Sequence, residues 1–168
     1  MDQYSIFHQS KIKQLWSTRE GWFRQTYQLT DGTYSYGMLS HSGFFDTIVQ
    51  IDTSEATWIV RKTGMSTMEV VDSEGLLTAI IERKWFTSKI IFTAINGFTA
   101  TYYQPSFWGR AQVWISKDQQ VLITQETRGF SQKDTFTYAD LTYQQPYLLL
   151  LSFLAMEFKL GRRRGAAV

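Results

Sequence analysis

Histidine, serine and acidic side chains are the groups in this chain that could support catalysis or bind a metal. Their spacing favours neither use. The 168 residues include two histidines, His8 and His41, and no cysteine. Neither histidine has a second metal-binding residue at helical or hairpin spacing, so we expect no zinc site. The absence of cysteine also excludes disulfides and a cysteine nucleophile.

The segment LSHSGFFD, residues 39–46, brings Ser40, Ser42, His41 and Asp46 close together in sequence. A catalytic triad depends on spatial geometry, and neighbours in an extended segment do not face one another. We therefore interpret His41 as a loop histidine. The chain has no nucleophile elbow and no phosphate-binding glycine loop. The sequence predicts no catalytic residue, no metal site and no cofactor, and hence a protein that is not an enzyme.

Glu157 is the most unusual carboxylate, because it directly follows an apolar run. Two interpretations stay open. Glu157 lies at the mouth of the fold and pairs with a lysine or arginine, or it is a buried acid with a raised pKa that faces a ligand.

Two basic pairs, Arg61-Lys62 and Arg83-Lys84, each end an extended run, and Lys89 follows closely. Adjacent strand residues point to opposite faces, so neither pair lines one surface by itself. One member of each pair, together with Lys89, is predicted to form a rim that attracts an anionic ligand, at about 1 kcal/mol per basic residue. The alternative is ordinary solubilising charge at strand ends.

Four aromatic residues, Trp85, Phe86, Phe107 and Trp108, fall in or near predicted loops. Such residues either form an exposed interaction surface or cover the core from outside.

The elements that must position these residues are strands. Extended runs rich in β-branched and aromatic residues alternate with turn sequences at Asp31-Gly32, Asp72–Gly75, Asn96-Gly97 and Lys117–Gln119. Asp-Gly favours a type I′ hairpin turn. The runs ATWIVRK and DTFTYAD lack clear turns, and the segment HQSKIKQLWSTRE is interpreted as a loop and a strand. About ten to twelve strands are expected over residues 1–140, in a sandwich or barrel.

The stretch QQPYLLLLSFLAMEFKLGRRRGAAV, residues 144–168, contains the strongest helical signal. A membrane span needs about 20 mostly apolar residues, whereas the apolar run covers only 147–156 before Glu157. A short helix that is apolar on every side is expected where protein surrounds it. We predict a buried helix over about 146–160, beginning after Pro146, and a solvated basic tail over 161–168. A tail anchor or interfacial helix is the alternative.

The length of the chain predicts a single domain that spans residues 1–168. A net charge of +2 gives no strong field for nucleic acid. The first residues lack the basic start and apolar run of a signal peptide, so we expect a cytoplasmic protein without a transmembrane span. The oligomeric state stays open.

The segment ATWIVRKTGMSTMEVVDSEGLLTAIIERKW, with its Asp72–Gly75 turn between strands, is followed by the hairpin SKIIFTAINGFTATYY and later by one apolar helix. This order resembles the LURP-one-related and phospholipid scramblase type of the tubby C-terminal-like superfamily. The resemblance implies a closed antiparallel barrel of about twelve strands around the buried C-terminal helix, which fills a lumen too wide for strand side chains. It does not extend to the proline-rich, cysteine-rich and calcium-binding segments of the scramblases.

The expected function is a non-enzymatic binding or interaction module. Its ligand is an anionic phospholipid head group or a protein partner. The alternative is a carrier of small apolar ligands with a lipocalin-like barrel, which requires an empty lumen.

Overall fold

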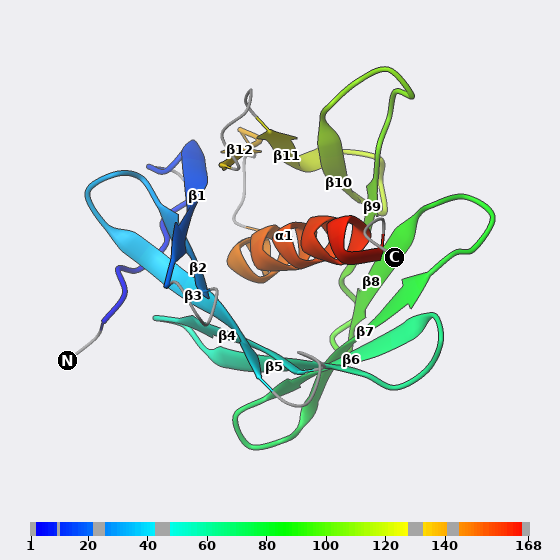
Figure 1. Ribbon diagram of the computed structural model, residues 1–168, viewed down its shortest axis with the longest axis horizontal. Coiled ribbons are helices and arrows are strands. Elements are labelled where there is room, and N and C mark those ends of the chain that lie inside the picture. Colours follow the sequence, from blue (N-terminus) through cyan, green and yellow to red (C-terminus); the bar gives the residue numbers. More distant parts are fainter. Residues whose placement is uncertain are drawn as a thin grey trace.

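The chain forms a closed antiparallel β-barrel with one helix inside it (Figure 1). The computed structural model describes residues 3–9, 11–21, 26–42, 48–127, 133–140 and 145–165. The fold class predicted from the sequence, a mainly β barrel closed around a C-terminal helix, is confirmed.

The described residues form twelve strands and one helix. The elements are β1 (Gln14–Glu20), β2 (Thr26–Thr30), β3 (Ser35–Ser42), β4 (Ile48–Thr53), β5 (Thr57–Lys62), β6 (Thr67–Asp72), β7 (Leu77–Arg83), β8 (Ile90–Ala94), β9 (Thr99–Tyr103), β10 (Gln112–Ser116), β11 (Val121–Thr127), β12 (Asp134–Tyr138) and α1 (Leu148–Gly165).

Each strand pairs with its neighbours in sequence, and β1 closes the barrel against β12. At the closure Gln14 to Trp16 lie opposite Thr137 to Thr135. Every connection therefore reverses the chain, so the loops that follow the odd-numbered strands all lie at the same end of the barrel. Closure pairs the strand edges that an open sheet would expose.

The turn at Asp31-Gly32 differs from its prediction. Only Gly32 has a positive φ, 93°, so the four-residue connection is not a type I′ turn. The Asp31 carboxylate instead accepts hydrogen bonds from the backbone N–H groups of Thr33 and Tyr34 and from the Tyr36 hydroxyl. Desolvation by itself raises the pKa of Asp31, but these hydrogen bonds outweigh it and hold the pKa below its ordinary value.

The other three predicted hairpin turns are confirmed. Gly75 and Gly97 have φ values of 83° and 88°, and Gln119 takes the left-handed conformation at 62°. The Asp72 carboxylate accepts the N–H groups of Glu74 and Leu76, each at 2.9 Å. These local bonds explain why turn sequences could be found without tertiary information.

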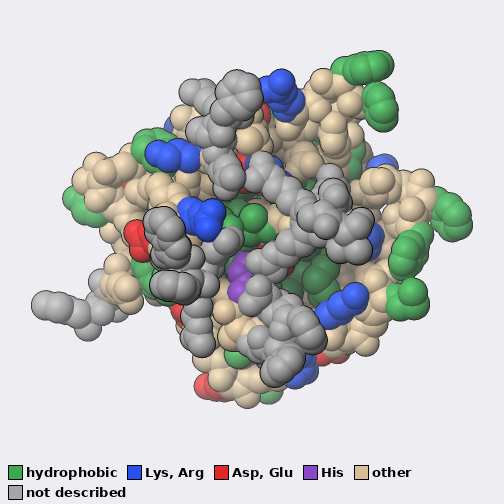
Figure 2. Space-filling model, in the orientation of Figure 1, with side chains coloured by type: hydrophobic (Ala, Val, Ile, Leu, Met, Phe, Trp, Pro, Cys, Tyr) green, Lys and Arg blue, Asp and Glu red, His purple; other side chains and the backbone are tan. Residues whose placement is uncertain are grey.

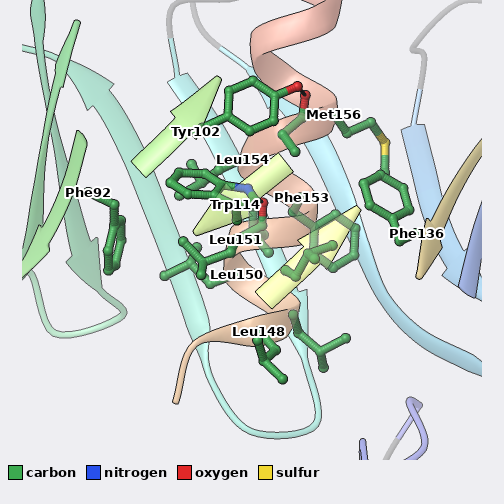
Figure 3. Close-up of a cluster of buried hydrophobic side chains, with 14 of the residues drawn as sticks. Phe92, Tyr102, Trp114, Phe136, Leu148, Leu150, Leu151, Phe153, Leu154 and Met156 are labelled. Atoms are coloured by element: carbon green, nitrogen blue, oxygen red, sulfur yellow. Dashed lines mark hydrogen bonds between the residues drawn. The ribbon is translucent and has the colours of Figure 1, made fainter. Parts of the chain in front are cut away.

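Helix α1 supplies the centre of the hydrophobic core. Every residue from Leu148 to Met156 is buried, as is Phe158. Large strand side chains such as Phe92, Tyr102, Trp114 and Phe136 surround the helix (Figure 3). Because strands enclose it on all sides, the helix needs no polar face, which is why its sequence is apolar throughout this stretch.

Two polar contacts fix the helix in the lumen. The Trp114 indole N–H donates to the Leu151 carbonyl at 2.8 Å (Figure 3). The Tyr138 hydroxyl lies 2.9 Å from the Ser152 hydroxyl, and Ser152 also donates to the Leu148 carbonyl. Burial raises the pKa of Tyr138, so its hydroxyl stays protonated and available for this bond. These buried polar groups are therefore hydrogen-bonded inside the core.

The helix bounds differ from the prediction at both ends. Tyr147 has a left-handed φ of 64° and its carbonyl accepts the N–H of Leu151, so Tyr147, and not Pro146, marks the helix start. At the other end α1 continues through Gly161 to Gly165, into the predicted basic tail. Arginine is a good helix former and cations stabilise a helix C-terminus. No helix in the described residues is long and apolar enough to cross a membrane.

Candidate functional site

One end of the barrel contains all the basic residues that the sequence singled out. It is formed by the loops 63–66, 84–89 and 104–111, which follow β5, β7 and β9, and by residues 157–161 of α1. We call it the aromatic end. The Arg83 N–H donates to the Ser66 carbonyl at 2.8 Å, which joins the first two loops.

The five predicted rim residues have different surroundings. Arg61 pairs with Glu69 at 3.1 Å, and Lys84 pairs with Glu82 at 3.2 Å. The Lys89 ammonium lies 5.4 Å from the centre of the Tyr103 ring, within range of a cation–π contact.

Two of the predicted rim residues, Lys62 and Arg83, line a pocket together with residues of α1. Neither forms an ion pair with a carboxylate of the described chain. One member of each basic pair therefore faces this pocket. Because adjacent strand residues point to opposite faces, such a division was expected, but the sequence does not indicate which member of each pair faces inward.

That pocket, the helix pocket, lies between the barrel wall and α1 and has a volume of about 180 Å³. Its wall side contains Lys62, Arg83 and the loop residue Met65, and its helix side contains Glu157 and Gly161. A Cβ built on Gly161 meets no described atom within 4 Å, so the missing side chain leaves open space there.

A second depression, the loop pocket, has a volume of about 700 Å³ and lies between the β7–β8 and β9–β10 loops. Arg83 and Lys84 contribute its positive charge, and Trp85, Tyr103 and Phe107 contribute aromatic surface. Arg83 lines both pockets and so lies between them.

Large apolar side chains project into solvent from the same three loops. Their exposed fractions range from 65% for Trp85 to 103% for Phe86, and the set is Met65, Trp85, Phe86, Phe107 and Trp108. Figure 2 shows hydrophobic side chains standing out over the β7–β8 and β9–β10 loops at the edge of the molecule. Of the two interpretations made from the sequence, the structure agrees with exposed side chains: these aromatics do not cover the core.

Glu157 lies at the barrel mouth, as one sequence interpretation had it, but its partner in the described chain is a histidine and not a lysine or arginine. His41 Nε2 lies 2.6 Å from Glu157 Oε2, with side-chain exposures of 4% and 17%. His41 belongs to β3, so its interpretation as a loop histidine is wrong. The alternating burial of β3 turns it toward the helix.

The tautomer of His41 follows from its other nitrogen. Nδ1 is buried and has no partner among the described residues. A bare nitrogen is less costly to leave unpaired than an N–H, so the proton is on Nε2 and is donated to Glu157. This hydrogen bond holds the Glu157 carboxylate in a fixed orientation at the helix pocket.

A buried ion pair near this end has no signal in the sequence. Lys159 of α1 contacts the Asp134 carboxylate and the Thr127 hydroxyl. Asp134 also accepts from Gln125 at 3.2 Å, and its backbone N–H donates to Ser17 at 2.9 Å. These contacts join α1 to β11, β12 and β1, and fix the helix register.

Residues 39–46, which were considered for a catalytic triad, form no catalytic arrangement within the described part of the chain. His41 Nε2 is taken by Glu157, and Asp46 lies outside the described residues. Within the described ranges no three His, Asp or Glu side chains come together as a metal-binding group.

Comparison with protein-family models, with curated proteins and with solved structures found no match to this chain.

Proposed function

We propose that this protein is a non-enzymatic module that binds anionic phospholipid surfaces through its aromatic end. The observation that carries the proposal is that exposed apolar side chains and basic side chains lie at the same end of the barrel. The apolar ones project from three loops and are Met65, Trp85, Phe86, Phe107 and Trp108. The basic ones are Lys62, Arg83, Lys84 and Lys89. The proposal includes membership of the tubby C-terminal-like superfamily, which the barrel-and-helix architecture supports. It also includes the cytoplasmic location expected from the sequence.

The exposed residue types at the aromatic end favour a lipid surface over a protein partner. Its apolar side chains project from three loops, and Phe86 and Trp108 are almost fully exposed. Tryptophan is enriched where membrane meets water, because its ring is apolar and its N–H is polar. The basic side chains beside the loops would meet phosphate groups while the tips enter the acyl boundary.

The expected affinity is modest and reversible. Full burial of one Phe side chain contributes about 1.5–3 kcal/mol, and each basic residue near an anionic surface about 1 kcal/mol. Two half-inserted aromatics and three cations would together contribute about 4.5–6 kcal/mol before the entropy lost on binding. Binding should therefore require anionic lipid and weaken with salt.

The carrier alternative has no supporting observation. It required an empty lumen, whereas side chains such as Leu150, Phe153 and Leu154 of α1 occupy that place and are fully buried.

Vesicle flotation tests the proposal. The full chain is expected to float with phosphatidylcholine vesicles that contain phosphatidylserine and not with phosphatidylcholine alone. Phe86→Ser with Trp108→Ser should reduce flotation at least tenfold. Leu76→Ser with Ile95→Ser is the matched control, because these side chains are 62% and 70% exposed at the opposite end.

Charge is tested in the same assay. Arg83→Gln with Lys84→Gln should weaken binding, whereas Lys117→Gln, in the exposed β10–β11 turn, should not. Failure to float with anionic vesicles would overturn the lipid proposal and leave the protein-partner hypothesis. An equal loss in the Leu76/Ile95 control would overturn the assignment of the aromatic end.

A further inference from the structure

We infer that the helix pocket binds a phosphoethanolamine group, with the phosphate at Lys62 and Arg83 and the ammonium at Glu157. The group could belong to a free metabolite or to a lipid head group. Only the lipid form rests on the proposed function, because the pocket and its charges are described without reference to a membrane.

The charges of the pocket are divided between its two sides. Lys62 and Arg83 come from the barrel wall, and Glu157 comes from the helix that faces it. In the described chain the cations have no carboxylate partner, and Glu157 pairs with His41 alone. A purely anionic ligand would meet Glu157, and a purely cationic one would meet Lys62 and Arg83. A small molecule with both charges satisfies both sides.

A phosphate suits the wall side better than a carboxylate does. A guanidinium fork and a separate ammonium can bind different oxygens of one phosphate at the same time. Glu157 suits a primary ammonium, because His41 occupies Oε2 and holds the carboxylate in place.

The pocket has room for a head group. A volume of about 180 Å³ corresponds to roughly six water molecules, at about 30 Å³ each in the liquid. Met65, Met68 and Phe158 line the pocket and can contact the two carbons between phosphate and ammonium.

Gly161 supports a binding role over a purely structural one. Glycine is unfavourable inside a helix, and α1 continues four residues beyond it. No close neighbour requires a glycine, because a Cβ there meets no described atom within 4 Å. Its absent side chain keeps the pocket open.

Calorimetric titration of the full chain measures how much the phosphate and the ammonium of the ligand each contribute to its affinity. Free phosphoethanolamine is expected to bind at least tenfold more tightly than inorganic phosphate or ethanolamine. Glu157→Gln keeps the acceptor for His41 but removes the charge. It should lower phosphoethanolamine affinity about tenfold without lowering that of phosphate. Arg83→Gln should weaken both.

Gly161→Leu fills the pocket and should abolish binding. Gly161→Ala serves as its folding control, and both variants should melt at or above the wild-type temperature because glycine is removed from a helix. Equal affinity of the wild type for phosphate and phosphoethanolamine, or unchanged binding by Gly161→Leu, would overturn the inference.

Vesicles distinguish the two sources of the group. Replacing part of the phosphatidylcholine by phosphatidylethanolamine leaves the vesicle surface uncharged. If the wild type floats with these vesicles and Glu157→Gln does not, the lipid is supported as the source of the group. If free phosphoethanolamine binds in the calorimetric titration but the protein floats with no vesicle, the free metabolite is supported as the source of the group. Only the proposed function is then overturned. Binding to phosphatidylserine vesicles with no response to either form of phosphoethanolamine overturns only this inference.

Discussion

Replacing Lys159 by Met should destabilise the protein more strongly than loss of a surface charge. The Lys159 and Asp134 side chains are 15% and 6% exposed, and they join α1 to the strand β12. Without the ammonium, Asp134 keeps hydrogen bonds from Thr127 at 2.8 Å and from Gln125 at 3.2 Å, but no countercharge among the described residues.

The magnitude follows from that burial. Breaking a buried ion pair by removing one partner costs about 3–5 kcal/mol. The two remaining hydrogen bonds to Asp134 place the expected loss near the lower limit, about 3 kcal/mol. Total stabilities of domains are about 5–15 kcal/mol, so the change is large but leaves the protein folded. Urea unfolding followed by the fluorescence of the chain's tryptophans, which include the buried Trp114, measures it.

Two variants make this prediction specific. Lys13→Met breaks the Lys13–Asp140 pair, whose side chains are 51% and 88% exposed, and should cost at most about 1 kcal/mol. Adding Asp134→Asn to Lys159→Met removes the uncompensated charge and should restore at least half of the loss. A Lys159→Met effect no larger than that of Lys13→Met, or a double variant with no recovery, would refute the reasoning.

Further predictions concern Gly37 and Asp31. A Cβ on Gly37 would lie 2.6 Å from the Asp52 carbonyl oxygen and 3.0 Å from the Phe153 ring, so Gly37→Ala should cost about 1–3 kcal/mol in urea unfolding; unchanged stability would contradict this packing. Because the folded pKa of Asp31 is lowered, its contribution is present above its unfolded value and is lost as pH falls through the folded pKa. The stability gap between wild type and Asp31→Asn should therefore shrink as pH is lowered from about 6 to about 3, and a gap independent of pH would show that the charge of Asp31 has no part in the turn.

The strands, most of the turns and the buried helix could be predicted because their signals are local, whereas the choice of a closed barrel over a sandwich came from the family resemblance. Alternating burial, as in β2 and β8, follows from the period of two in the sequence. The turns at Asp72–Gly75 and Asn96-Gly97 are closed by their own side chains and glycines. The short apolar run ending at Met156 could be assigned to a protein interior from its length alone.

The site was less predictable because its contacts join distant residues. His41 and Glu157 are 116 positions apart, and Lys159 and Asp134 come from different elements. Such pairs produce no periodic pattern in the sequence. The start of the helix depends on similar tertiary contacts: Tyr147, which precedes Leu148, takes a left-handed conformation while its ring packs on Phe92 and Phe98.

The most direct test of the membrane proposal is to find out which end of the barrel meets the lipid. The chain contains no cysteine, so Trp108→Cys and Ile95→Cys each give one labelling site for an environment-sensitive fluorophore, at opposite ends of the barrel. With phosphatidylserine-containing vesicles, the label at position 108 should shift to the blue and brighten, whereas the label at position 95 should not change. A shift at position 95, or none at position 108, would contradict the account.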